Sequence, residues 1–394
     1  MGANGLDTGE RIAARVEAFV RAEVMPYESD PRTQGRHGPL DELVDELREK
    51  ARKAGVLTPH IGDGGLHLSH RATATILRRA GLSPLGPLAV NVMAPDEGNM
   101  YLLGEVATPE QKAHFLQPLV AGTSRSAFLM TEPAAEGGAG SDPSMMKTIA
   151  RRDGGDWVIN GKKAFITGMT GAAVGILMAR TDTGGDKMGA TLFLVDLPNP
   201  AIRIERLIDT IDNASPGGHA VVTIDDLRVP DDQILGAVHQ GFHYAQVRLA
   251  PGRLTHCSRW LGAATRAQEI ATAYTTSRHA FGKLLIDHEG VGFMLADNHI
   301  ALKQAELTID WCAGVLDSGQ LGTVESSMAK VAVSEALFKI ADRCVQMMGG
   351  TGVSGDTVVE QIFREIRAFR IYDGPTEVHK WSLAKSIKRA ALAA

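Results

Sequence analysis

Three segments of the chain combine polar side chains and glycines in patterns that could bind a ligand or move a proton. Residues 131–142 gather hydroxyls, glycines and a proline, and residues 163–168 form a strand-like run with an aromatic residue, a hydroxyl and a final glycine. Residues 370–380 place Asp373 in an Asp-Gly-Pro turn behind Tyr372. A carboxylate there could act as a general base, although taken alone such an aspartate is more often an Asx-turn residue.

Other patterns fail on their context. Residues 350–355 match GxGxxG, but they follow a helical pattern, whereas a dinucleotide fingerprint follows a strand. His67, His70 and His256 lack the spacing of metal ligands, so we expect structural or solvated histidines and no metal. The absence of GxSxG, HExxH and Walker A sequences excludes the hydrolase and ATPase classes that are easily recognised.

Composition indicates an ordinary globular protein. The 394 residues are 44% hydrophobic and 22% charged, enough for two or three domains. A net charge of −5 gives no footprint for nucleic acid, and no apolar run approaches the ~18 residues of a membrane span. The N-terminal residues do not resemble a signal peptide, and the odd number of cysteines, 3, is typical of buried free thiols in a reducing compartment. We therefore expect a cytoplasmic protein without nucleic-acid or membrane partners.

The elements that must position these segments follow the order helix, strand, helix. Apolar residues recur at helical spacing in the first third, up to about residue 122, and again from residue 295 onward. Between them, β-rich runs are separated by Asp-Gly and by Asn160-Gly161, which both predict hairpins. We predict an α+β multidomain chain with an N-terminal helical domain (1–124), a middle antiparallel β-barrel or sandwich (125–233) and a C-terminal helical bundle (234–394).

Taken together, six collinear segments resemble the acyl-CoA dehydrogenase family over nearly the whole chain. They are TEP…GAGSDPS, DWVINGKKAFITG, DDLRVP, SRHAFGKLL, QMMGG and IYDG. APDEGNM and PGRLTHCSRW are most similar to the branch that contains family members ten and eleven. The resemblance implies a helical domain, a β-barrel and a four-helix bundle, usually assembled as a tetramer. It also implies FAD bound between barrel and bundle, an acyl-CoA substrate and an electron-transfer flavoprotein as the electron acceptor.

The resemblance assigns the following residues to FAD. Contacts with the flavin ring fall to Phe128, Met130, Thr131, Phe165, Ile166 and Thr167, and Ser141 would meet both FAD and the pantetheine arm of the substrate. Arg278 and Phe281 would reach the FAD of a neighbouring subunit, and Gln346, Gly349 and Gly350 would hold its adenosine half. These roles predict a homo-oligomer, a dimer of dimers.

The same resemblance places the catalytic base at Asp373, where the family has glutamate. The base removes the α-proton of the thioester while a hydride leaves C3 for the flavin. Arg253, Tyr372 and Gly374 fall at substrate-binding positions beside it, as does Ser141. We expect desolvation beside an acyl chain to raise the pKa of Asp373.

Departures from the family pattern keep two alternatives open. Gly252 occupies the place where some relatives carry the base, Ala250 replaces a frequent acid, and 9 residues separate Thr131 from Ser141, where the family usually has five. Nitroalkane oxidases of the same fold use an aspartate, so Asp373 also permits an oxygen-using oxidase. A DNA-binding alkylation-response relative would need a basic surface, which the net charge of −5 disfavours.

Overall fold

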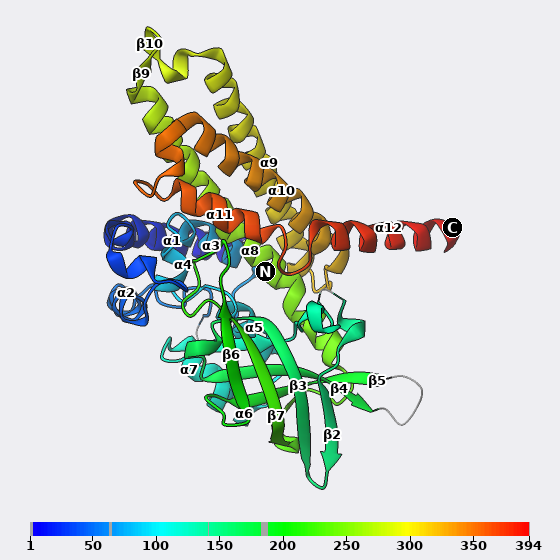
Figure 1. Cartoon of the computed structure of the whole chain (residues 1–394). Helices are drawn as coiled ribbons and strands as arrows, with labels where there is room; N and C mark the ends of the chain where they lie inside the picture. Colours follow the sequence, from blue (N-terminus) through cyan, green and yellow to red (C-terminus); the bar gives the residue numbers. More distant parts are fainter. Residues whose placement is uncertain (1–2, 63–64, 141, 183–187, 394) are drawn as a thin grey trace.

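The computed structural model of the chain describes residues 3–62, 65–140, 142–182 and 188–393. Helices form the first and last parts of the chain and a sheet forms the middle, which is the order that the sequence predicts (Figure 1). Among the described helices, none has both the length and the hydropathy that are required to cross a bilayer.

Twelve α-helices are found in the described part of the chain. Their bounds are α1 Ala3–Phe19, α2 Asp41–Lys53, α3 His70–Ala80, α4 Gly86–Ala89, α5 Asp96–Val106, α6 Pro109–Gln111, α7 Gln117–Val120, α8 Gly241–Ser277, α9 Glu289–Asp317, α10 Thr323–Met348, α11 Val359–Phe369 and α12 Thr376–Ala393. The N-terminal helices begin and end where local chemistry directs. Thr108 and Gln111 form a capping box at the start of α6, and α2 stops just before Gly55, whose φ is +63°.

The middle of the chain forms one mixed sheet. Its strands are β1 Ser126–Leu129, β2 Ile149–Asp153, β3 Asp156–Thr167, β4 Val174–Asp182, β5 Met188–Asp196, β6 Ile202–Ile208, β7 His219–Pro230 and β8 Ile234–Leu235. They pair in the order β6-β7-β3-β2-β4-β5-β8, with β1 on β4. Most pairings are antiparallel, but β1–β4 and β2–β4 are parallel.

Of the two predicted hairpins, one is confirmed and one is wrong. The Asp-Gly turn joins β2 to β3, with Asp153 opposite Asp156. Asn160-Gly161 lies inside β3, where the pairing with β7 shifts register. The Asn160 side chain exchanges hydrogen bonds with Asp226 on β7, and a Cβ on Gly161 would come within 2.5 Å of Thr148. The glycine therefore serves a β-bulge and not a turn.

Helices α8, α9, α10 and α11 pack as the C-terminal bundle, and α8 also contacts α3 and α5 of the N-terminal part. The bundle buries Cys257, Cys312 and Cys344 as free thiols, as predicted. The short hairpin of β9 (His279–Ala280) and β10 (Lys283–Leu284) lies at the end of the bundle far from the sheet, and α12 projects from its side (Figure 1). Helix α8 thus spans the distance between the sheet and that hairpin.

Candidate active site

Asp373 lies in the turn between α11 and α12 with a left-handed backbone, at φ +54°. Its carbonyl oxygen accepts a hydrogen bond from Arg253 Nε at 3.2 Å and lies 3.1 Å from His379 Nε2. The next carbonyl, of Gly374, accepts from Lys330 Nζ at 2.9 Å. Side chains from α8, α10 and α12 therefore hold the backbone of this turn, and the strained residue stays fixed.

The Asp373 side chain points toward α8. Its Oδ2 lies 3.4 Å from Nε2 of His256. A Cβ on Gly252 would lie 3.9 Å from the same oxygen, so this glycine borders the carboxylate without a side chain of its own. Asp373 thus occupies the space beside the helix position that bears the base in some relatives.

The prediction of a raised pKa for Asp373 is wrong. Burial alone would raise the pKa, but the His256 contact and the charges of Arg248, Arg253 and Lys330 outweigh it and lower the pKa below the ordinary value. The prediction assumed apolar surroundings, whereas the folded chain surrounds the carboxylate with basic groups. Asp373 is therefore an ionised carboxylate at neutral pH.

A buried polar cluster connects Asp373 with the sheet. The guanidinium of Arg248 lies 4.2 Å from the centroid of the Phe128 ring on β1, and its Nε donates to Asn99 Oδ1 on α5 at 2.8 Å. Glu97, two residues before Asn99 on α5, accepts from Thr255 Oγ1 at 2.7 Å and pairs with Arg259 at 3.3 Å. The Arg248 guanidinium thus contacts the Phe128 ring and interacts electrostatically with Asp373, so one cation acts on two predicted site residues.

The predicted flavin-contact residues of the sheet lie together at the ends of β1 and β3. Ala164 N donates to the Thr131 carbonyl at 2.9 Å, Ile166 is buried, and the Thr167 hydroxyl lies 2.9 Å from His219 Nδ1. Phe165 stands between them with φ +56° and its side chain 58% exposed. An exposed aromatic ring on a strained backbone, beside two threonines, fits a flat aromatic ligand such as the isoalloxazine ring.

A buried ion pair fixes these two strands to each other. Lys163 Nζ donates to the Met130 carbonyl at 3.0 Å and to Glu132 Oε1 at 3.1 Å. The Glu132 carboxylate also accepts from the backbone N–H groups of Lys147 at 2.6 Å and Thr148 at 2.9 Å. Burial lowers the pKa of Lys163 to about 8, although the charge of Glu132 opposes this decrease. Because both partners are buried, removing either leaves an uncompensated charge.

The remaining predicted cofactor residues are not brought to this edge. Arg278 and Phe281 lie at the β9–β10 hairpin, at the end of the bundle opposite the sheet (Figure 1). Phe281 is 94% exposed, and a Cβ on Gly349 or Gly350 would meet no atom within 4 Å. Gln346 is also exposed, so these groups are open to another molecule. Ser141 lies outside the described residues.

The other predicted substrate-binding residues surround Asp373. Tyr372 accepts a hydrogen bond from Trp260 Nε1 at 2.5 Å, and burial raises the pKa of its hydroxyl. Gly374 has φ +103°, and a Cβ there would come within 2.7 Å of His379 Nε2. Arg253 is directed at the backbone of the base. The turn therefore needs glycine after Asp373, and Arg253 supports the turn.

Sequence reasoning missed Arg248, Glu97 and Lys330 and dismissed His256. A signal was present for two of them, because Arg248 and His256 lie one helical turn on either side of Gly252. The inference was missed because helical spacing shows which residues share a face but not what that face contacts.

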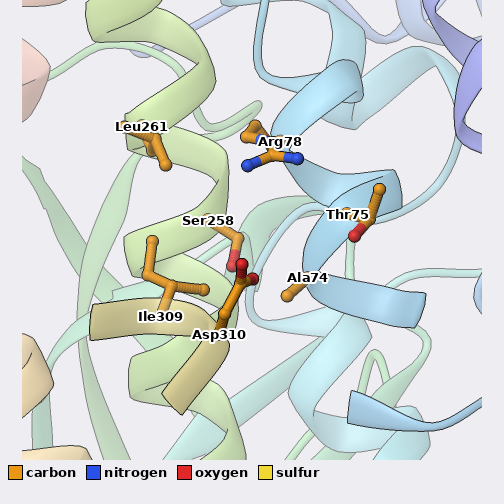
Figure 2. A pocket seen from close by; sticks show the side chains of 7 residues that line it. All are labelled: Ala74, Thr75, Arg78, Ser258, Leu261, Ile309 and Asp310. Atoms are coloured by element: carbon orange, nitrogen blue, oxygen red, sulfur yellow. The ribbon is translucent and has the colours of Figure 1, made fainter. Parts of the chain in front are cut away.

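One crevice lies outside this site. A narrow crevice of about 170 Å³ between α3, α8 and α9 is lined by Ala74, Thr75, Arg78, Ser258, Leu261, Ile309 and Asp310 (Figure 2). It contains none of the predicted site residues, and Arg78 at its edge pairs with Glu306. In the described ranges, no group of three or more His, Cys, Asp or Glu residues is arranged to hold a metal ion.

Comparisons with known proteins address the family and the fold. Three family models match the chain: acyl-CoA dehydrogenase N-terminal domain at residues 7–123, middle domain at 127–220 and C-terminal domain at 239–388. Acyl-CoA dehydrogenase family member 11 of Gallus gallus is 33% identical over 96% of this chain, which spans about half, 50%, of that relative. "Probable acyl-CoA dehydrogenase FadE2" of Mycobacterium tuberculosis is 34% identical, over 94% of this chain and 93% of its own length.

Solved structures show the same fold. A Mycobacterium abscessus protein assigned to the acyl-CoA dehydrogenases superimposes with a TM-score of 0.87 at 36% identity, covering 98% of both chains. A glutaryl-CoA dehydrogenase from Mycobacterium smegmatis, in complex with FADH2, gives a TM-score of 0.82 at 25% identity over 96% of this chain and 94% of its own. The predicted fold class is confirmed, and the chain belongs to the acyl-CoA dehydrogenase family.

Proposed function

We propose that the protein is an FAD-dependent acyl-CoA dehydrogenase that converts an acyl-CoA thioester to 2-enoyl-CoA, as in β-oxidation. The observation that carries the proposal is the Asp373 turn. It holds an ionised carboxylate beside α8, and Arg248, whose guanidinium lies 4.2 Å from the centroid of the Phe128 ring, acts on this carboxylate through its charge. An oxidoreductase of this family needs such a base facing the flavin.

In this proposal Asp373 removes the α-proton. Its lowered pKa keeps the carboxylate charged at neutral pH, and the cations around it also favour the negative charge that develops on the thioester oxygen. The backbone N–H of Asp373 has no acceptor in the described part of the chain, which leaves it available to the thioester carbonyl. Bound FAD would supply the acceptor for the hydride that leaves C3.

The proposed cofactor site is shared between chains. Phe128, Met130, Thr131, Phe165, Ile166 and Thr167 would contact the flavin ring, with Ser141 near the pantetheine arm. Arg278, Phe281, Gln346, Gly349 and Gly350 would serve a neighbouring subunit, since the chain does not fold them onto its own sheet edge. Their exposure supports a role toward another chain, and FADH2 in the glutaryl-CoA dehydrogenase neighbour supports binding of a flavin.

We further propose a homotetramer built as a dimer of dimers. Exposed apolar residues recur along α9 at Phe293, Ile300, Leu307 and Trp311, and along α12 at Trp381, Ile387 and Leu392. Several exposed large apolar residues on one helix favour association between subunits. The same proposal includes domain limits at 1–124, 125–233 and 234–394, a cytoplasmic location, and an electron-transfer flavoprotein as the acceptor of electrons from the flavin.

An oxygen-using oxidase of the nitroalkane type is the second candidate. The observation that favours it is the aspartate base in a strongly cationic setting, which suits a nitro group as well as a thioester enolate. A DNA-binding role has weaker support because the net charge is −5.

Anaerobic mixing of the FAD-loaded protein with a panel of acyl-CoAs tests the proposal. Bleaching of the flavin by at least one acyl-CoA, with formation of the 2-enoyl product, is the expected result. If no acyl-CoA bleaches the flavin and nitroalkanes are turned over in air, the protein is an oxidase and the proposed dehydrogenase function is wrong.

A further inference from the structure

The imidazole of His256 packs between aromatic rings and Asp373, the proposed base. It lies on α8 one turn beyond Gly252, and its ring centroid is 5.9 Å from that of Phe369 and 4.8 Å from that of Tyr372. Trp260 in turn holds the Tyr372 hydroxyl. The Phe369 and Tyr372 rings also pack against each other, with centroids 5.5 Å apart, so this aromatic cluster restricts the directions in which the two nitrogens of His256 point.

Only one of these nitrogens faces an acceptor. Nε2 lies 3.4 Å from Asp373 Oδ2, whereas Nδ1 is buried and has no hydrogen-bond partner among the described residues. A hydrogen on Nδ1 would be an unpaired buried donor, whereas a hydrogen on Nε2 would have a carboxylate oxygen 3.4 Å from the nitrogen. The tautomer with its hydrogen on Nε2 is therefore favoured.

The ring carries no charge at physiological pH. Burial, together with the neighbouring charges of Arg259, Arg248 and Lys330, lowers the pKa of His256 to about 3, against the opposing effect of Asp373. The other titratable groups around the pair are Arg253 on α8, Glu97 on α5, Tyr372 in the turn and His379 on α12. The single N–H of the neutral ring is thus available to Asp373 when it is carried on Nε2.

The carboxylate has little other support. The bonds from Arg253 and His379 hold the carbonyl of Asp373, and Arg248 and Lys330 act on its carboxylate through charge. Within the described residues, His256 is the one group at ion-pair distance from an Asp373 carboxylate oxygen. An aspartate base also has one methylene fewer than glutamate with which to adjust its position.

We propose that His256 is a positioning residue for Asp373, an inference that rests on the proposed function. Its Nε2–H holds Oδ2, and Oδ1 is left to accept the substrate α-proton. The role does not require a change in the protonation of His256, and the ring stays neutral throughout.

Two substitutions at position 256 separate the effect of the hydrogen-bond donor from the effect of the packed ring. His256→Phe keeps the packing against Phe369 and Tyr372 and removes the N–H, whereas His256→Gln keeps an N–H near the position of Nε2. The pKa of Asp373 is measured by carbon-13 NMR of labelled aspartate carboxyls in the FAD-loaded protein, with Asp373→Asn to assign the signal. The rate of anaerobic flavin reduction by acyl-CoA is measured over the same pH range.

We expect His256→Phe to raise the pKa of Asp373 by about one to two units, since hydrogen bonds to charged groups are worth that much. The acid limb of the rate profile should move up equally, and the plateau rate should fall about tenfold because the carboxylate loses its orientation. His256→Gln should restore most of both. An unshifted pKa in folded His256→Phe, or a Gln variant as impaired as Phe, would overturn the proposal.

His379→Gln is the matched control, because His379 contacts the carbonyl of the same residue and not its carboxylate. It should alter the stability of the turn and leave the Asp373 pKa in place. An equal pKa shift in both histidine variants would show a general structural effect and overturn the specific role of His256. If no acyl-CoA reduces wild-type flavin, the proposed function fails, yet the NMR titration still decides whether His256 holds Asp373.

Discussion

Replacing Asp373 by asparagine should abolish the reaction while preserving the site. The hydrogen bonds that fix the turn go to the backbone carbonyls of Asp373 and Gly374, so they survive the change. Asparagine has nearly the same shape but cannot accept a proton. FAD binding and the fold should therefore remain intact.

The loss should be close to the upper end of the range for removal of a general base, about 10⁴-fold. The other buried carboxylate of the cluster, Glu97, is already engaged by Thr255 and Arg259 and cannot substitute. The positive charges of Arg248, Arg253 and Lys330 would also lose a buried counter-charge, so we expect stability to fall by about 1–3 kcal/mol.

Stopped-flow measurement of flavin bleaching under anaerobic conditions gives the rate, and the flavin spectrum and urea unfolding give FAD content and stability. The comparison needs variant and wild-type protein with matched FAD content, so that a lower rate reflects the chemical step. Flavin reduction by Asp373→Asn within about tenfold of wild type would show that the base lies elsewhere, and the assignment of the site would fail.

Four further predictions follow from the geometry. Asp373→Glu should lose activity by about tenfold or more, because Oδ2 is already 3.4 Å from His256 and an added methylene displaces the carboxylate; a rate at or above wild type would show spare room. The pKa of Asp373 is lowered in the folded protein, so its ionised form stabilises the fold above the ordinary pKa, and this stabilisation is lost as the pH falls through the folded-state pKa. Because Asp373 stays ionised, the rate of flavin reduction should also stay level from pH 7 to about 5. A midpoint near neutrality in a pH–rate series would contradict the lowered pKa. Lys163→Met should lower the free energy of unfolding by about 3–5 kcal/mol, measured in urea, and weaken FAD binding, because Glu132 stays buried without its partner; an unchanged midpoint argues against it. Arg278→Ala should weaken FAD retention and the oligomer together in gel filtration, and a monomer with full FAD would separate the two.

The sequence by itself determined the order of the elements and identified Asp373 as the candidate base. Helical and strand periodicities arise from neighbouring residues, so the helix–sheet–helix order and the capping of α6 by Thr108 could be predicted locally. Asp373 was found because it lies within one of six collinear family segments. The burial of Cys257, Cys312 and Cys344 as free thiols was predicted from their odd number and their helix-like sequence.

Only the tertiary structure decided the chemistry around that base. The pKa of Asp373 depends on Arg248, His256 and Lys330, which lie on α8 and α10 and reach the turn only when those helices pack together. Asn160-Gly161 carries a turn signature, but its pairing with Asp226 on a distant strand makes it a bulge. In each case the outcome depends on a contact between residues that are far apart in the sequence. Electrostatic and packing energies depend on distances in space, and local sequence propensities carry no information about those distances.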